Sequence, residues 1–259
     1  MAHAAVNGVR VRYDESGAGP ALLLSHGFSA TGRMWDDQRR AFADRWRVIA
    51  WDMRGHGDTE SPDDPARYSA DLTVGDMRAL LVHLGIRRAV IGGLSLGGYM
   101  SLFFHAQHPE MTRALVLCDT GPGYRNAEAR AGWNDRAFRR ASELETRGLE
   151  VLASASREMR EAMRQHRSAK WLAHAARGML AQDGARVIDS LSTVRVPTLV
   201  IVGDQDEPFL APCRYMAGKI PGARLEIIRG AGHSANLDQP EAFNRVLGDF
   251  LDSLPAEPA

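Results

Sequence analysis

The sequence has little of several features that define common protein classes. Only two of its 259 residues are cysteines, Cys118 and Cys213, which is too few for a disulfide scaffold. Its 32 Lys and Arg balance 32 Asp and Glu, and the lack of a basic excess argues against a nucleic-acid or membrane-surface partner. No window approaches the roughly 20 apolar residues of a membrane span, and residues 1–17 carry no run typical of a signal peptide. We therefore expect a cytoplasmic protein.

Short apolar runs recur along the chain and predict strands. Residues 9–16 alternate between apolar and polar side chains, as a half-exposed strand does. Continuous apolar runs instead suit strands that are buried on both faces of a parallel sheet. Such runs occur at residues 21–27, 46–52, 88–93, 113–119 and 198–204. With residues 9–16 these make six strand candidates, and residues 223–230 are a seventh.

Amphipathic segments lie between these runs and predict helices. Residues 69–85 place apolar side chains on one stripe, and Gly85 is suited to end that helix. Residues 239–254 repeat the pattern, with Pro240 in a first helical turn. Alternation of strands and helices predicts an α/β fold with a mostly parallel sheet.

The alternation stops between residues 122 and 191, where no strand-like run occurs. This segment predicts several helices and carries 13 Lys and Arg against 9 Asp and Glu, a net charge of +4. We expect a core made of residues 1–121 and 192–259, with residues 122–191 inserted as a helical lid over the strand ends. The tail at 254–259 is expected to fray.

A serine stands between glycines where a predicted strand meets a predicted helix. Residues 93–97, Gly-Leu-Ser-Leu-Gly, match the pattern G-x-S-x-G, and a helix-like run follows at 99–109. A sharp strand-to-helix turn of this kind exposes the hydroxyl of a nucleophile, here Ser95, and needs small residues around it. The alternative is a turn serine that only caps the next helix.

A serine nucleophile needs a general base and an orienting carboxylate. His233 follows the predicted strand at 223–230, and Asp204 and Asp206 follow the one at 198–204. These places, past the carboxyl ends of strands, are where open α/β sheets build their sites. Asp119, at the end of another strand, is a third candidate for the acid.

Acyl transfer also needs N–H donors for the oxyanion. One candidate is the backbone N–H of Leu96, the residue after the serine, and the other is that of Phe28 in the loop after the strand at 21–27. Gly27 allows the backbone to approach closely. We expect the Phe28 side chain to form an apolar wall beside the substrate carbonyl.

Taken together and in order, these pieces resemble the α/β-hydrolase superfamily over nearly the whole chain. The matching stretches are HGF at 26–28, DMRGHGDT at 52–59, GLSLGG at 93–98, and GDQDEPF at 203–209 with GAGHSANLDQPEAF at 230–243. The resemblance implies an eight-stranded, mostly parallel sheet flanked by helices, with a helical cap after the sixth strand. By position it makes Ser95 the nucleophile, His233 the base and Asp206, in preference to Asp204, the acid.

The resemblance also gives the loop at 52–59 a structural role, with Asp52 and Arg54 held by hydrogen bonds. Zinc-ligand spacing is absent, so neither a metal nor a cofactor is expected. No heptad pattern predicts an oligomeric partner.

The expected reaction is hydrolysis of a small carboxylic ester or lactone through an acyl-enzyme. The start of the 122–191 segment is similar to caps of enol-lactone hydrolases, which suggests that Trp133 and Arg136 bind substrate. The same triad would also serve a carbon–carbon bond hydrolase of ring-fission products, or a cofactor-free perhydrolase or haloperoxidase. A ligand receptor without catalysis is a further alternative.

Overall fold

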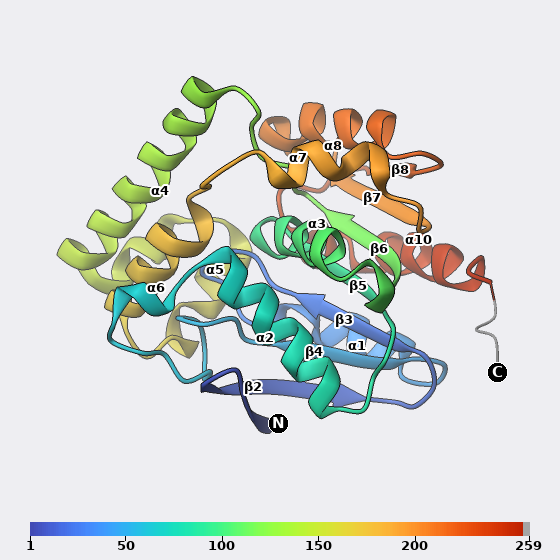
Figure 1. Cartoon of the computed structure of the whole chain (residues 1–259), viewed down its shortest axis with the longest axis horizontal. Coiled ribbons are helices and arrows are strands. Elements are labelled where there is room, and N and C mark those ends of the chain that lie inside the picture. Colours follow the sequence, from blue (N-terminus) through green and yellow to red (C-terminus); the bar gives the residue numbers. More distant parts are fainter. Residues whose placement is uncertain (256–259) are drawn as a thin grey trace.

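The computed structural model describes residues 1–255 and contains one eight-stranded sheet (Figure 1). The strand order is β1-β2-β4-β3-β5-β6-β7-β8. β2 runs antiparallel to β1 and β4, and the pairs from β4 to β8 are parallel. The strands are β1 (Ala2–Val6), β2 (Val9–Ser16), β3 (Ala21–Ser25), β4 (Arg47–Trp51), β5 (Ala89–Leu94), β6 (Thr112–Cys118), β7 (Thr198–Gly203) and β8 (Arg224–Ile228).

All seven strands expected from the sequence are present, and the mostly parallel α/β prediction is confirmed. The sequence pattern missed β1, which forms a hairpin with β2 through Asn7 and Gly8. These two residues have φ of 46° and 75°. An Asn-Gly pair is the strongest short-range signal for such a turn, so the sequence does contain the clue to β1.

The central strands are buried throughout because helices cover both sheet faces. Every residue of β3, β5, β6 and β7 is buried. Side chains of α1 (Asp36–Phe42) and α10 (Pro240–Asp252) pack into one core cluster, and those of α2 (Ala70–His83), α3 (Leu96–Gln107) and α8 (Glu207–Lys219) pack into the other. The helical elements of this part are η1 (Gly32–Trp35), α1 (Asp36–Phe42), η2 (Pro65–Arg67), α2 (Ala70–His83), α3 (Leu96–Gln107), η3 (Pro109–Met111), η7 (Leu191–Thr193), α8 (Glu207–Lys219), α9 (Ala235–Asp238) and α10 (Pro240–Asp252).

Both predicted helix signals are confirmed. Gly85 has φ of 70° just after α2, and Pro240 opens α10. Cys118 and Cys213 are buried and free. Among the helices of residues 1–255, none has the length and apolarity needed to cross a membrane.

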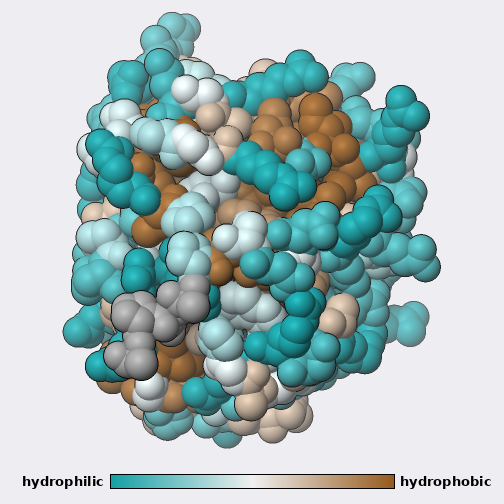
Figure 2. Space-filling view, turned by 90° about the vertical axis from the view of Figure 1, so that its right-hand side faces the viewer, coloured by the Kyte–Doolittle hydropathy of each residue, from teal (hydrophilic) through white to brown (hydrophobic). Residues whose placement is uncertain are grey.

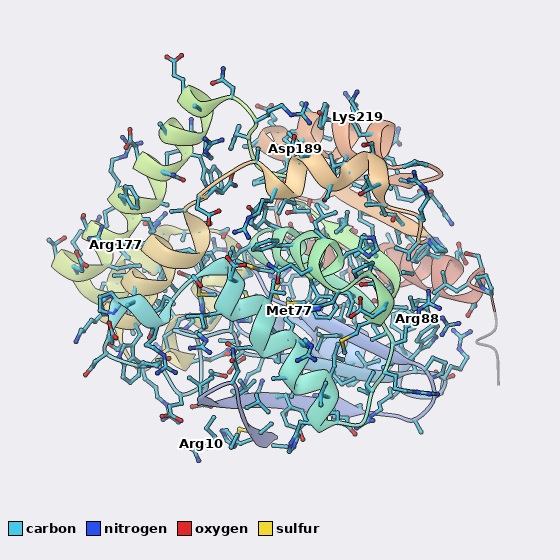
Figure 3. All side chains as sticks on the ribbon, viewed as in Figure 1. Arg10, Met77, Arg88, Arg177, Asp189 and Lys219 are labelled. Atoms are coloured by element: carbon cyan, nitrogen blue, oxygen red, sulfur yellow. The ribbon has the colours of Figure 1, made fainter. Side chains whose placement is uncertain are left out.

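Residues 122–191, which we call the helical insert, lie between β6 and β7 without any strand of their own. Figure 1 shows α4 and α6 beyond the ends of the parallel strands, and α4 projects away from the sheet. Charged side chains cover the outside of the insert (Figure 3), where Arg177 pairs with Glu145 at 2.7 Å. Its elements are α4 (Ala127–Arg147), η4 (Gly148–Ser154), α5 (Arg157–Ala162), η5 (Met163–Gln165), α6 (Ala169–Ala175), η6 (Ala176–Leu180) and α7 (Arg186–Ser190).

The division of the chain into two units at 121/122 and 191/192 stays a prediction, as does the cytoplasmic location. The tail at 254–259 was expected to fray, but Leu254 is buried and the Pro255 carbonyl accepts from Arg113 Nη2 at 2.8 Å. Residues 256–259 lie outside the described part of the chain. Figure 2 shows the face of the molecule opposite the insert, where hydrophobic residues gather toward the top of an otherwise largely hydrophilic surface.

Candidate functional site

Ser95 sits at a strained turn between β5 and α3. Its φ of 54° and ψ of −115° lie in a region that residues with a side chain rarely occupy. The turn is tight enough that a Cβ on Gly93 would meet Gly97 at 2.4 Å, and one on Gly97 would meet the Ser25 carbonyl oxygen at 2.3 Å. The glycines of the G-x-S-x-G pattern are therefore required by close backbone packing, which holds the serine at the end of the strand.

The loop after β3 lies against this serine. A Cβ on Gly27 would lie 3.6 Å from the Ser95 Cβ, in ordinary contact, but only 3.0 Å from Leu94 Cδ2, so the glycine lets the loop approach the end of β5. Within residues 1–255, the backbone N–H groups of Phe28 and Leu96 donate to no protein acceptor. Leu96 is the first residue of α3. The N–H groups in the first turn of a helix have no acceptor within that helix, and the helix dipole favours negative charge there.

A buried histidine holds the Phe28 loop in place. The Met53 N–H donates to His26 Nε2 at 2.9 Å, so Nδ1 carries the proton and donates to the Gly27 carbonyl at 2.7 Å. Burial lowers the pKa of His26 to about 3, which keeps the ring neutral. The Phe28 ring does not line the cavity at Ser95, because it packs edge-on against His56 with centroids 5.6 Å apart. The expectation of an apolar wall from Phe28 is therefore wrong.

The insert reaches the same loop through a second buried histidine. The Gly57 N–H donates to His166 Nδ1 at 3.1 Å, and His166 Nε2 then donates to the Ser29 carbonyl at 2.9 Å. Burial lowers the pKa of His166, and burial followed by the neighbouring His26 lowers that of His56. His166 thus bridges two core loops in its neutral form.

His233 is paired with Asp206. The imidazole Nδ1 lies 2.8 Å from Asp206 Oδ2, and Asp206 is 5% exposed at the entrance of α8. Burial lowers the pKa of His233, but the hydrogen bond that its Nδ1–H donates to Asp206 and the charges of Asp206, Glu158 and Asp119 outweigh this effect and raise the pKa overall. With Nδ1 engaged by the carboxylate, Nε2 is left to act on a substrate or nucleophile.

The two alternative acids make other contacts. Asp204 accepts the Gly230 N–H at 2.8 Å. Asp119 accepts the Gly203 N–H at 2.8 Å and the Ala235 N–H at 3.4 Å, and burial raises its pKa well above the ordinary value. Both carboxylates hold backbone N–H groups of the neighbouring loops, so the geometry favours Asp206 as the partner of the His233 imidazole.

A cavity of about 140 Å³ opens beside Ser95, between the core and the insert. Its wall is mainly apolar and aromatic, and Phe209 links it to the imidazole, with ring centroids 4.8 Å apart from His233. The lining residues are Ser95, Leu96, Tyr99, Thr120, Gly121, Pro122, Gly123, Tyr124, Trp133, Arg136, Leu180, Gln182, Pro208, Phe209 and Pro212.

Both cap residues singled out in the sequence line this cavity. Trp133 Nε1 donates to the Leu180 carbonyl at 2.8 Å and so fixes the indole against the end of η6. Of the lining side chains, Arg136 alone carries a charge. No hydrogen bond or ion pair within residues 1–255 engages Arg136, whereas its neighbours Arg130 and Arg140 contact Tyr124 and Glu143.

The loop at 52–59 is structural, as expected. Asp52 accepts the N–H groups of Gly32 and Asp58 at 2.8 and 3.0 Å, and Arg54 is fully buried against Asp76, with Nε 2.6 Å from Oδ2. No group of three His, Cys, Asp or Glu side chains in the described part of the chain is arranged to hold a metal ion.

Sequence reasoning missed Glu158, His166 and Gln182. Glu158 and His166 are buried between insert and core, and the side-chain Oε1 of Gln182 is buried beside the cavity without a partner among the described residues. Each lies in a segment of mixed charge among exposed and half-buried neighbours. No local pattern separates Glu158 and His166 from solvated residues, because their partners in the core, Ser234 and Ser29, lie 76 and 137 residues away.

The chain is similar to known enzymes over most of its length. A model described as "Alpha/beta hydrolase family" matches residues 22–246. A Bacillus subtilis protein with the provisional name 2-succinyl-6-hydroxy-2,4-cyclohexadiene-1-carboxylate synthase is 29% identical, over 94% of this chain and 96% of that protein. 3-Oxoadipate enol-lactonase 2 of Acinetobacter baylyi is 28% identical, over 88% and 87%. The crystal structure of the enol-lactonase from Burkholderia xenovorans LB400 covers 97% of this chain and 100% of that one, with a TM-score of 0.84 and 28% identity.

Proposed function

Because this chain belongs to the alpha/beta hydrolase family, we propose that it hydrolyses a small carboxylic ester or lactone through an acyl-enzyme on Ser95. The observation that carries the proposal is the strained Ser95 at the wall of a mostly apolar cavity, with the His233–Asp206 pair adjoining that cavity through Phe209. Strain of this kind persists where the surrounding structure holds a residue for a task.

In the proposed reaction, the Ser95 hydroxyl attacks the substrate carbonyl carbon while His233 Nε2 takes its proton. Asp206 keeps the imidazole in the required tautomer and stabilises its charged form. The free N–H groups of Phe28 and Leu96 donate hydrogen bonds to the developing oxyanion. Each such donor stabilises the transition state by about 3–4 kcal/mol. The leaving alcohol departs with the proton, and water repeats the cycle on the acyl-enzyme.

Arg136 supports a substrate that carries a carboxylate. It is the one charged side chain on the described cavity wall and has no acidic partner of its own within residues 1–255, so a bound anion would be its natural counterion. Trp133 would offer its face to the apolar part of the same molecule. The enol-lactonase names among the relatives fit such an anionic lactone.

Covalent labelling tests the proposal directly. A fluorophosphonate probe should label the wild-type protein, and Ser95→Ala should lose both the label and ester turnover while its thermal melt stays unchanged. The control is Ser101→Ala, since Ser101 lies in the same helix and its hydroxyl bonds only to the Gly97 carbonyl. Wild-type turnover by Ser95→Ala would refute the role of Ser95.

A substrate panel then separates the reaction classes that share this triad. It should contain neutral aryl esters, carboxylate-bearing esters, enol-lactones and dienoate ring-fission products, with a halide, peroxide and acetate assay beside them. Fastest turnover of a carboxylate-bearing ester or lactone supports the proposal. Preference for the dienoate or for halide oxidation favours the alternative enzymes, and a ligand-induced thermal shift without turnover favours a receptor.

A further inference from the structure

The insert contributes a buried carboxylate to the loop that carries His233. Glu158, in α5, is 2% exposed, although its neighbours Arg157 and Glu161 are open to solvent. Ser234, the residue after His233, donates its hydroxyl hydrogen bond to Glu158 Oε2, and Ser156 donates to Oε1. Both carboxylate oxygens are therefore occupied by serine hydroxyls, one from the core and one from the insert.

Glu158 has no cationic partner among the described residues, which is a costly arrangement for a buried carboxylate. The contacts that Glu158 makes therefore have to account for its buried position. The residue it reaches in the core is adjacent to His233, and the same stretch is tied to the insert again where Arg157 Nη1 donates to the Leu237 carbonyl at 2.7 Å.

We propose that Glu158 is a positioning residue, which fixes the His233 loop through Ser234 and favours the charged imidazole by its own negative charge. The insert would then take part in the chemistry of the core, in addition to covering it. This inference rests on the proposed function only in taking His233 as the general base.

Three carboxylates surround His233, and they come from different elements. Asp206 precedes α8, Asp119 follows β6, and Glu158 comes from the insert. Burial lowers the pKa of His233, and the charges of these carboxylates raise it, Glu158 among them. Arg33 and Glu161 line a small cavity with Glu158 at the junction of insert and core. Arg157, next to Glu158, lies 3.6 Å from Asp238, which accepts the Gly232 N–H beside His233.

The loop is held from two sides. On the core side, Asp119 accepts the Ala235 N–H at 3.4 Å, and on the insert side Glu158 accepts a hydrogen bond from the Ser234 hydroxyl. Removal of the contact between Ser234 and Glu158 leaves the Asp206–His233 pair intact but allows the imidazole to move relative to Ser95. A displacement of this kind lowers kcat more than it raises KM.

An NMR titration of the His233 ring tests the electrostatic part without any substrate. The pKa of His233 should be lower in Glu158→Gln than in the wild type, because one nearby negative charge is lost. It should stay unchanged in Glu161→Gln, a matched loss of charge on the same helix. An unchanged pKa in Glu158→Gln, or an equal fall in Glu161→Gln, would overturn this part. Because the readout is spectroscopic, absence of turnover on esters would leave it standing.

Ser234→Ala tests the mechanical part, and also serves if Glu158→Gln fails to fold. It keeps the carboxylate and removes the contact to the His233 loop, so kcat should fall about tenfold with little change in KM. Ser156→Ala removes the other hydrogen bond of the same carboxylate and should leave kcat near wild type. Equal effects of the two variants, or no effect of Ser234→Ala, would contradict the positioning role.

Discussion

The core and the insert differ in what holds them together. Each residue of β3, β5, β6 and β7 is buried, whereas α4, with 21 residues, buries only Ala137, Ala141 and Leu144. The core is stabilised by continuous apolar burial. The insert adds apolar side chains of its own to one core cluster, among them Leu152, Leu172 and Met179, and it also meets the core through polar contacts such as those of His166 and Glu158.

This difference assigns different tasks to the two regions. A tightly packed sheet can hold a strained turn such as that of Ser95, because neighbouring backbone leaves no room for relaxation. The exposed residues of the insert, such as most of α4, are easier to vary without loss of the fold, and they suit the selection of a substrate. Substitutions in the core site should therefore change kcat, and substitutions in the insert, apart from Glu158, should change KM or stability.

The largest expected effect comes from the acid. Asp206→Asn should lower kcat by about 10⁴-fold, because the imidazole loses the partner that sets its tautomer. Asp204→Asn, which removes only an acceptor for the Gly230 N–H, should leave kcat near wild type. Steady-state kinetics on the best substrate of the panel measure both. A larger loss in Asp204→Asn would exchange the roles of the two carboxylates.

The contacts of His166 between core and insert should contribute less to the free energy of unfolding at acidic pH. His166 has a lowered pKa when folded, so below its ordinary value of about 6.5 the unfolded chain binds the extra proton. The stabilisation it contributes is present above that pH and is lost as the pH falls, by up to about 1.4 kcal/mol per pH unit. The lowered pKa values of His26 and His56 also make the folded protein less stable as the pH falls. The raised pKa values of Asp119 and His233 have the opposite effect on its stability.

A difference measurement isolates the contribution of His166. Urea unfolding of the wild type and of His166→Asn should give free energies of unfolding that converge between pH 7.5 and pH 5. A gap that stays constant with pH would show that His166 does not remain neutral in the folded protein.

Arg136 should affect substrate choice and spare the chemistry. Arg136→Gln should raise KM about tenfold for a carboxylate-bearing ester, because a charge-assisted hydrogen bond is lost. Its kinetics on a neutral ester should stay unchanged. Arg139→Gln is the control, since Arg139 lines a separate surface hollow on α4. Equal losses on charged and neutral esters would argue against carboxylate recognition.

The smallest effect is expected for Trp133→Phe. This change keeps an aromatic face but removes the hydrogen bond to the Leu180 carbonyl, which should cost about 1 kcal/mol of stability. Thermal unfolding measures the loss, and KM should rise a few-fold for every ester alike. A selective effect on charged esters would instead place Trp133 in the recognition of the anion.

Much of the fold could be predicted because its signals are local. The buried strands are continuous apolar runs, Gly85 and Pro240 mark helix ends, and the glycines around Ser95 mark a tight turn. The strand β1 was missed because five half-exposed residues carry little apolar signal, although the Asn-Gly turn beside it does.

The rest depended on contacts between distant parts of the chain. Three aspartates follow strand ends in the sequence, and only their positions in space show that Asp206 is the one against the imidazole. Phe28 looks from the sequence like a cavity wall, and it packs against His56 instead. Hydrogen-bond partners depend on three-dimensional position, which local residue patterns do not encode.

By itself the sequence determined that this protein has a mostly parallel α/β sheet and a serine at a glycine-rich strand end, because backbone preferences and apolar periodicity act over a few residues. Only the tertiary structure decided which carboxylate meets His233, that Trp133 and Arg136 line the cavity at Ser95, and that Glu158 reaches the His233 loop. These features arise where segments up to 76 residues apart are packed together, and packing is a property of the whole chain.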